Sequence, residues 1–193
     1  MELVYNEFVR RKMRGFTLIE LILVMAIVGI LAVVGIGAFT SATVKSRDTQ
    51  RKNDLNQIAK ALESFINDVG RYPLVDADGI MTCPEYDGSV LTEKSCYGSL
   101  MADIGDSNSE VYTKAYYMVK IPTDPDKSRK YIYKKTDTGY ALYTALENAE
   151  DRDVVKDTDG SNTNWDSDGG MCGTNISCTY KLTDTGLVRI NTE

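Results

Sequence analysis

The feature that most constrains this chain is a long apolar run directly behind a basic segment. Residues 16–39 contain a single formal charge, Glu20, and no proline, whereas four basic residues lie just before them: Arg10, Arg11, Lys12 and Arg14. As a helix that rises about 1.5 Å per residue, the run would extend roughly 36 Å, which is enough to cross a hydrocarbon core of about 30 Å. The basic flank favours a cytoplasmic N-terminus, so the sequence predicts one membrane segment with the remaining chain outside.

Two residues, Gly15 and Glu20, distinguish this run from an ordinary secretion signal or membrane anchor. A signal peptide is cut after its apolar region, whereas Gly15 lies before the run, so cleavage at Gly15 would keep the apolar helix. An acidic side chain at the bilayer centre costs on the order of 2.5–3.5 kcal/mol, and less near an end. Glu20 therefore needs a partner. The alternative is that it lies in the first helical turn, favoured by the helix dipole and reaching the interface.

The six residues Gly-Phe-Thr-Leu-Ile-Glu at 15–20, placed before such a run, resemble the processing site of type IV pilins and pseudopilins. The resemblance is specific over residues 10–73. It implies that a prepilin peptidase removes the leader, residues 1–15, by cutting between Gly15 and Phe16, and methylates the new amine of Phe16. It also implies that Glu20 meets the Phe16 amine of a neighbouring subunit during assembly, because a paired amine and carboxylate offset each other's desolvation in lipid.

Behind residues 16–39, which form the transmembrane and assembly half, residues 40–70 are predicted to continue the same helix as an amphipathic half. Apolar side chains recur there at steps of three and four residues: Leu55, Ile58, Ala59, Leu62, Phe65, Ile66 and Val69. Gly70 and Pro73 are expected to end a helix of about 54 residues. Three glycines, Gly29, Gly35 and Gly37, either give the flexibility of the proline that related pilins often carry, or allow close helix approach.

The remaining chain is predicted to form a helix-to-sheet connecting region, residues 71–111, and an antiparallel sheet domain, residues 112–193. A short helix is expected near 99–104, because a structureless loop of this length is unusual. Strands are expected at 112–121, 130–135 and 140–147, the last two joined as a hairpin, with a second hairpin around the turn at 183–186. One face of the sheet is expected to lie on the helix and the other to be partly solvated.

All four cysteines lie on the predicted exported side, where disulfides persist. Sequence proximity favours Cys83 with Cys96 and Cys172 with Cys178 among three possible connectivities. Zinc is the weaker interpretation, because the spacings contain no CxxC pair.

An acidic loop between Asn148 and Asn175 carries half of a calcium motif. Ligand-type residues stand at alternate positions, with Gly169 sixth in the motif: Asn164, Asp166 and Asp168, with Asp157 and Asp159 as extra donors. The twelfth position is Asn175 instead of a bidentate Glu. Calcium is therefore one hypothesis and a solvated acidic loop is the other, and no cofactor is required by the sequence.

Composition disfavours enzymes and nucleic-acid binding. The chain has no His, which removes the commonest general base and metal ligand. The net charge is −6, and removal of the leader makes it −8. An acidic chain has no broad basic field, so sequence-specific nucleic-acid binding is not expected.

These features together predict an α+β pilin fold, in which a long N-terminal α-helix packs on an antiparallel β-sheet with a disulfide-stapled C-terminal region. The resemblance implies a structural, non-enzymatic subunit that waits in the cytoplasmic (inner) membrane and then polymerises with copies of itself into an extracellular type IV pilus filament, used for adhesion, motility or DNA uptake. It further implies an assembly ATPase and an inner-membrane platform protein as partners. One alternative is the major pseudopilin of a type II secretion system, which builds a periplasmic pseudopilus. Another is a single-span calcium-binding or adhesive module that does not polymerise.

Overall fold

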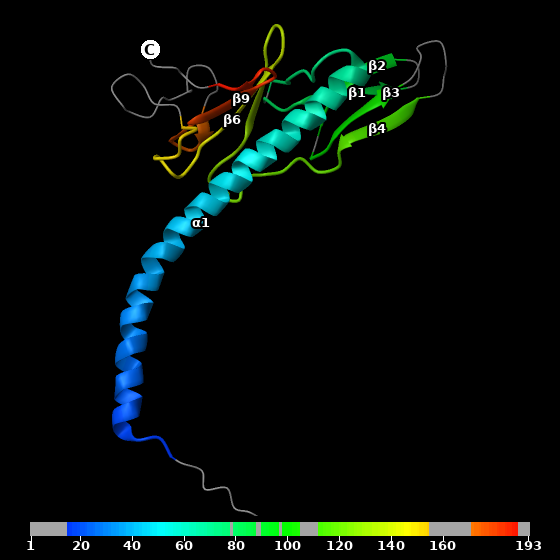
Figure 1. Ribbon diagram of the computed structural model, residues 1–193. Coiled ribbons are helices and arrows are strands. Elements are labelled where there is room, and N and C mark those ends of the chain that lie inside the picture. The colour runs from blue at the N-terminus through cyan, green and yellow to red at the C-terminus, as the bar shows by residue number, and fades with distance from the viewer. Residues whose placement is uncertain are drawn as a thin grey trace, which may run out of the picture. The chain divides into compact units, whose positions relative to one another are not determined.

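The structure is a computed structural model that describes residues 15–77, 79–87, 90–96, 98–104, 112–154 and 171–188. Within the first of these ranges, it describes only the backbone of residues 34–38. Two compact units make up the chain, Met1–Ala42 and Thr43–Glu193. One helix, α1 (Leu18–Val69), begins in the first unit and ends in the second (Figure 1). The predicted single long helix is confirmed, and Gly29, Gly35 and Gly37 all lie within it.

The sequence predicts a membrane span over residues 16–39. The described part of the chain contains no helix that meets the length and apolar character of a membrane span.

Helix α1 ends at the predicted glycine. Gly70 has a φ of 78°, and its N–H donates to the carbonyl of Ile66 at 2.8 Å. This left-handed cap satisfies one of the last free carbonyls of the helix, and a residue without Cβ adopts it without strain.

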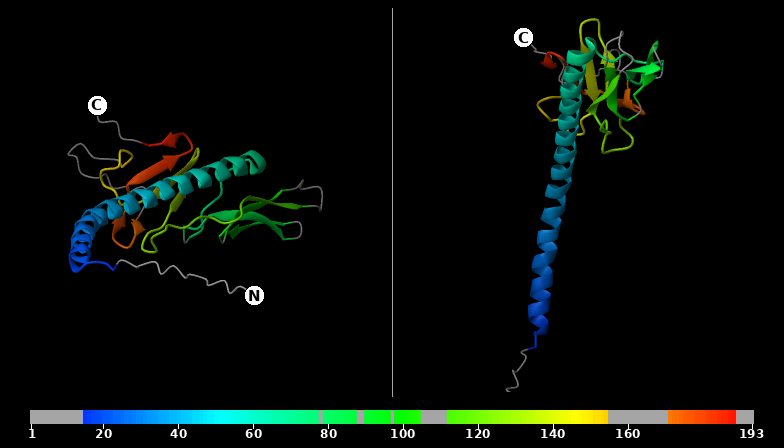
Figure 2. Two further views of the ribbon diagram at one scale, coloured as in Figure 1. Left: turned by 60° about the horizontal axis from the view of Figure 1, so that its bottom comes forward. Right: turned by 90° about the vertical axis from the view of Figure 1, so that its right-hand side faces the viewer.

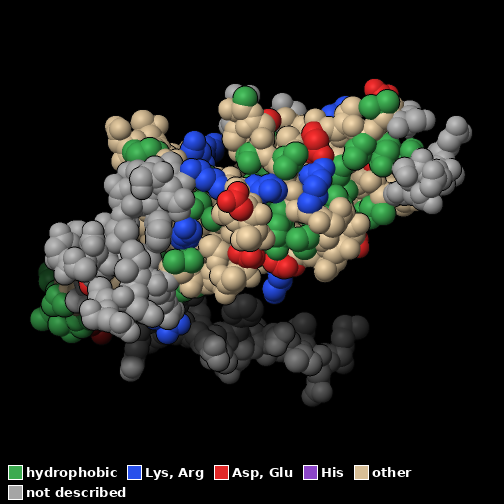
Figure 3. All heavy atoms as spheres, turned by 90° about the horizontal axis from the view of Figure 1, so that it is seen from above, with side chains coloured by type: hydrophobic (Ala, Val, Ile, Leu, Met, Phe, Trp, Pro, Cys, Tyr) green, Lys and Arg blue, Asp and Glu red, His purple; other side chains and the backbone are tan. Residues whose placement is uncertain are grey.

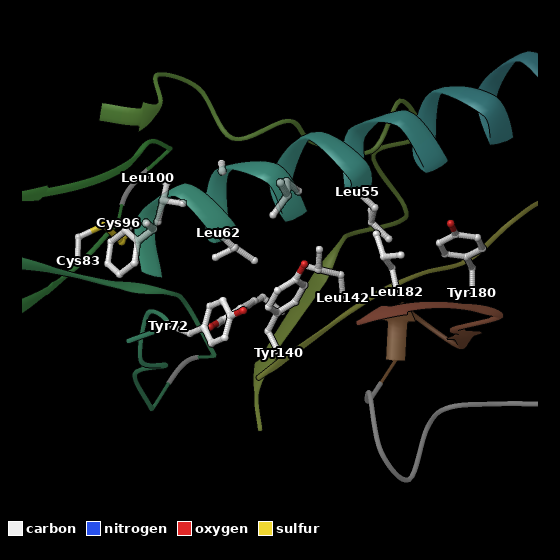
Figure 4. Packing of buried hydrophobic residues seen from close by; sticks show 14 of the residues in the cluster. Leu55, Leu62, Tyr72, Cys83, Cys96, Leu100, Tyr140, Leu142, Tyr180 and Leu182 are labelled. Carbon is white, nitrogen blue, oxygen red and sulfur yellow. A yellow bond between two sulfur atoms is a disulfide. The ribbon is translucent and has the colours of Figure 1, made fainter. Parts of the chain in front are cut away.

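The second half of α1 lies along one side of the strands of the second unit (Figure 2). Its predicted apolar stripe forms the core: Leu55, Ile58, Leu62 and Phe65 are buried, and Ala59, Ile66 and Val69 pack beside them. Figure 4 shows Leu55 and Leu62 among Leu142, Leu182 and Tyr140 of the strands beneath. Apolar side chains at three- and four-residue steps thus cover the sheet, as the period predicts.

Four strands form the main antiparallel sheet in the order β10-β9-β6-β5. Their bounds are β5 (Ile132–Lys135), β6 (Tyr140–Thr144), β9 (Tyr180–Thr183) and β10 (Gly186–Leu187). Both predicted hairpins are present: β5 pairs with β6 and β9 with β10, while β6 and β9 join them at the centre. All five residues of β6 are buried, which identifies it as the central strand with a cover on each face.

The cover on the second face is a C-terminal disulfide hairpin, β7 (Met171–Gly173) with β8 (Ile176–Ser177). Cys172 is bonded to Cys178 and packs with Ala141, Tyr143 and Ala145 in a separate small core. The prediction that the second face of the sheet is partly solvated is therefore wrong for β6. The disulfide closes this hairpin, and both cysteines are buried against the residues of β6.

The region 71–111 is more than a connection, because it contains β1 (Thr82–Asp87), β2 (Val90–Ser95) and β3 (Leu100–Ile104). The prediction of a short helix near 99–104 is wrong, since β3 lies there and pairs with β4 (Thr113–Met118). Leu100 and Ala102 are buried while Met101 and Asp103 are more exposed, which is the two-residue period of a strand. The second disulfide, Cys83–Cys96, ties the base of the β1–β2 hairpin and adopts the pairing that proximity favours.

The surface of the second unit is mixed in charge. On the face seen in Figure 3, basic and acidic side chains lie beside one another among hydrophobic ones. Ion pairs such as Glu85 with Lys94 and Lys114 are typical of this unit.

Replacing Gly173 by Ala tests the seating of the disulfide hairpin. A Cβ at Gly173 would lie 2.3 Å from the backbone oxygen of Ser128 and 2.9 Å from Ile176 Cδ1. Because backbone cannot move aside cheaply, we expect a loss of about 1–3 kcal/mol in the free energy of unfolding, measured by thermal denaturation. The control is Gly139→Ala, whose Cβ would meet the Asp184 carboxylate at 2.3 Å, the end of a side chain that can rotate away. Equal losses in the two variants would contradict this account.

Candidate functional site

The first unit presents large apolar side chains to the outside. They are at least half exposed and occupy nearly every position, so they lie on all sides of α1; Leu18 is 81% exposed and Ile19 is 75%. The set comprises Phe16, Leu18, Ile19, Leu21, Ile22, Leu23, Val24, Met25, Ile27, Val28, Ile30, Leu31, Val33 and Phe39. A helix that is apolar all round is stable when lipid or other helices cover it. We call residues 16–39 the assembly segment.

A reciprocal cap fixes the start of the assembly segment. Thr17 precedes the first helical residue, and its Oγ1 accepts the backbone N–H of Glu20 at 3.3 Å. In return, Glu20 Oε2 accepts the Thr17 N–H at 2.9 Å and the Thr17 hydroxyl at 2.8 Å. This Thr-x-x-Glu capping box satisfies donors that an apolar surrounding could not. Among the described residues, Glu20 Oε1 accepts no hydrogen bond, so one carboxylate oxygen stays available.

The bond between Gly15 and Phe16 lies just outside this cap. Residues 15–17 have no regular secondary structure and are exposed, with Phe16 at 84%. A Cβ at Gly15 would meet nothing within 4 Å. The peptide bond is therefore open to another protein.

A buried ion cluster organises the second unit around Arg51, whose side chain is fully buried. Its Nε and Nη2 donate to the two carboxylate oxygens of Asp124 at 2.8 Å each, and Nη1 donates to Asp48 Oδ1 at 2.8 Å. Nη2 also lies 2.7 Å from Glu147 Oε1. Burial alone would lower the pKa of Arg51, but these hydrogen bonds outweigh it and raise the pKa. The guanidinium is therefore held charged inside the protein.

Further contacts extend the cluster along the segment after β6. Asp48 accepts the backbone N–H groups of Glu147 and Asn148 at 2.9 and 2.8 Å. Lys52 Nζ lies 2.6 Å from Asp151 Oδ1 and 2.8 Å from Asp153 Oδ2. Sequence reasoning missed these residues. The available signal is that Asp48 and Arg51 continue the spacing of the buried stripe that begins at Leu55.

The predicted calcium ligands Asn164, Asp166, Asp168, Asp157 and Asp159 lie outside the described residues. Within the part that the structure describes, no group of three acidic or cysteine side chains is arranged to hold a metal ion. Calcium binding by the acidic loop stays a prediction.

Comparison with known proteins finds similarity to pilins and pseudopilins. Residues 10–36 match the model of the prokaryotic N-terminal methylation motif. The chain is 27% identical to the type II secretion system core protein G of Pseudomonas aeruginosa over 159 residues, which are 82% of this chain and 99% of that protein. The methylation motif and this similarity support the resemblance to type IV pilins and pseudopilins. The chain is also 42% identical to the type IV major pilin protein PilA of Myxococcus xanthus over 59 residues, 31% of this chain and 27% of that protein. No solved structure matches.

Among the residues that the sequence predicts for processing and assembly, Glu20 lies in the first turn of α1. Glu20 and Thr17 meet in the cap, in agreement with the alternative that Glu20 lies in the first helical turn. Cleavage between Gly15 and Phe16, and the pairing of Glu20 with the Phe16 amine of another copy, stay predictions.

Replacing Arg51 by Met tests the buried cluster. The change leaves the carboxylates of Asp48 and Asp124 buried without their cation, so we expect a loss of about 3–5 kcal/mol in the free energy of unfolding. The control is Arg47→Met, which removes a side chain that is 39% exposed and also pairs with Glu147; its loss should be about 1 kcal/mol or less. Chemical denaturation of the two variants in parallel measures the difference, and similar losses would refute the special role of Arg51.

Stability should also depend on pH through Glu147. The hydrogen bond from Arg47 lowers the pKa of Glu147 below its ordinary 4.5, against an opposing effect of burial. A carboxyl group whose pKa is lower in the folded state stabilises the fold above the unfolded value and loses this contribution as the pH falls through the folded value. Glu147→Gln should therefore be less stable than the parent near pH 6, and the gap should close as the pH falls towards 3. A gap that stays constant over that range would contradict the linkage.

Proposed function

We propose that this chain is a structural subunit of a filament that is assembled through residues 16–39. The observation that carries the proposal is the exposed apolar surface of the assembly segment, which water alone does not stabilise. Before assembly the surrounding is the membrane, and afterwards it is a bundle of the same segment from other copies. Transfer from lipid to such a bundle gains little from the hydrophobic effect, so packing and polar pairing set the register.

Processing by a prepilin peptidase is supported by the methylation motif and by the exposed bond between Gly15 and Phe16. Cleavage there leaves Thr17 and Glu20 in place, so the cap survives and the new amine stands one residue before it. Glu20 Oε1 is then the acceptor for the Phe16 amine of a neighbouring copy. A cytoplasmic assembly ATPase and an inner-membrane platform protein complete the proposed machinery.

We assign the filament to a type IV pilus, because the C-terminal region carries a disulfide hairpin of its own, β7–β8, which covers the second face of β6 and resembles the elaborations of surface pilins. A type II secretion pseudopilus is the second candidate. It is favoured by the similarity to core protein G, which extends over nearly all of that protein, whereas the similarity to the pilin covers 27% of its length.

Mass spectrometry of material sheared from intact cells separates these assignments. We expect a filamentous fraction in which the chain begins at a methylated Phe16. Processed protein that stays with the cell envelope would transfer the assignment to the pseudopilus. An uncut junction between Gly15 and Phe16 would refute both and leave an anchored module that does not polymerise.

The matched variant is Glu20→Ala. It should be processed normally but yield no sheared filament, because the amine of the incoming copy then has no carboxylate to pair with in an apolar surrounding. Normal filament yield from Glu20→Ala would remove the proposed role of that pairing.

A further inference from the structure

The second unit contains a cavity that takes no part in the proposed assembly. It has a volume of about 410 Å³ and lies between α1, the segment before β5, and strands β5 and β6. This volume falls within the range of about 300–1,000 Å³ that is typical of sites for small molecules. Ile58 and Leu142 are buried and form the floor of the cavity. Further apolar side chains complete its lining: Met81, Ile121, Pro122 and Ile132.

The polar groups near the floor are already bonded within the protein. The hydroxyls of Tyr131 and Tyr133 donate to Asp54 and to the carbonyl of Pro73, at 2.8 Å each. The carboxylate of Asp124, which also lines the cavity, is occupied by the buried ion cluster. A polar group on the floor would therefore lose its hydrogen bonds to water without replacement, so the part of a ligand that reaches the floor must be apolar.

The rim of the cavity carries three cations that have unused bonding capacity. Lys127 and Lys130 are exposed, and among the described residues neither ammonium group forms an ion pair. Arg129 lies between them in sequence, and its Nη1 donates to the carbonyl of Ala145 at 3.0 Å. Its Nε is buried without a hydrogen-bond partner in the described part of the chain, 3.5 Å from Asp126 Oδ2. An anionic oxygen at the rim would supply what these groups lack.

The charge around the rim is positive in an otherwise acidic chain. Residues 120–135, which supply most of the lining, contain six basic residues and two acidic ones, whereas the whole chain has a net charge of −6. Both acids are already engaged: Asp124 accepts from Arg51, and Asp126 accepts the N–H and the hydroxyl of Ser128. A cationic ligand would be repelled here, and a neutral one would leave the lysines without a partner.

We propose that this cavity binds a single-chain amphipathic carboxylate, of the kind represented by a medium-chain fatty acid. The hydrocarbon chain lies on the floor formed by Ile58 and Leu142. The carboxylate stands at the rim, where Lys127 and Lys130 neutralise its charge and Arg129 Nε can donate to one of its oxygens. The site belongs to the second unit alone, so it does not depend on the filament proposed above.

Photolabelling of the full chain in nanodiscs of zwitterionic phosphatidylcholine tests the site. The probe is dodecanoate with a diazirine near the end of its chain, and mass spectrometry should find the label in peptides that contain residues 121–133 or Leu142. A matched probe with the same chain and a trimethylammonium head should label these peptides about tenfold less. Labelling is expressed relative to the assembly segment, whose exposed apolar side chains take up either probe.

Variants separate the two parts of the site. Lys127→Gln combined with Lys130→Gln should lower labelling by the dodecanoate probe about tenfold. The matched control is Lys120→Gln combined with Lys135→Gln, which removes the same charge from exposed lysines outside the lining and should leave labelling unchanged. Met81→Trp places a larger side chain in the cavity without changing its charge, and should also abolish the labelling. Thermal denaturation checks that each variant is folded.

Equal labelling by the two head groups would overturn the proposal, as would full labelling of the variant that lacks Lys127 and Lys130. Competition identifies the source of the ligand: unlabelled dodecanoate should displace the probe, and phosphatidylglycerol should not. If phosphatidylglycerol competes equally well, the occupant is a membrane lipid and the proposal is wrong. Because the assay uses unassembled chains, its outcome is the same whether or not the chain forms a filament, so failure here leaves the proposed function untouched.

Discussion

The burial of the Arg51 guanidinium is the constraint on which the second unit depends. A buried cation requires carboxylates around it, and here they come from three separate parts of the chain: Asp48 on α1, Asp124 before β5 and Glu147 after β6. The apolar stripe of α1 would hold a sheet in several registers, because apolar contacts are not directional. The planar guanidinium of Arg51 can form all its hydrogen bonds in one arrangement of these segments. The ion cluster therefore supplies the specificity that the hydrophobic core lacks.

How much of the fold could be predicted from the sequence depends on how far apart in the chain the interacting residues lie. The capped end of α1 at Gly70, the stripe from Leu55 to Val69 and the two hairpins of the main sheet follow from neighbours within a few residues, so the sequence was sufficient for them. The strands β1 and β2 were missed because they carry many polar and charged residues and Pro84 lies inside β1; a disulfide ties these two strands together, and β3 pairs separately with β4. Arg51 was missed because a charged residue on a helix is normally solvated, and two of its three carboxylate partners, Asp124 and Glu147, lie 73 or more residues away in sequence.

The parts of the candidate site also differ in whether the sequence alone could predict them. The apolar segment and the proposed processing residues are contiguous, so a short motif was enough to predict them, and the methylation-motif model matches the chain over residues 10–36. The Arg51 cluster is assembled from segments that no motif connects, and it becomes visible when the fold has placed Asp48, Asp124 and Glu147 around one side chain.

The capping box at Thr17 and Glu20 has a consequence for the order of events. Both residues lie after the bond that the proposed peptidase cuts, so the first helical turn is nucleated while the leader is still attached. Nucleation is the costly step of helix formation, and here cleavage does not undo it. The enzyme would meet a substrate that is already helical two residues after the scissile bond, and the product would enter polymerisation with its first turn formed.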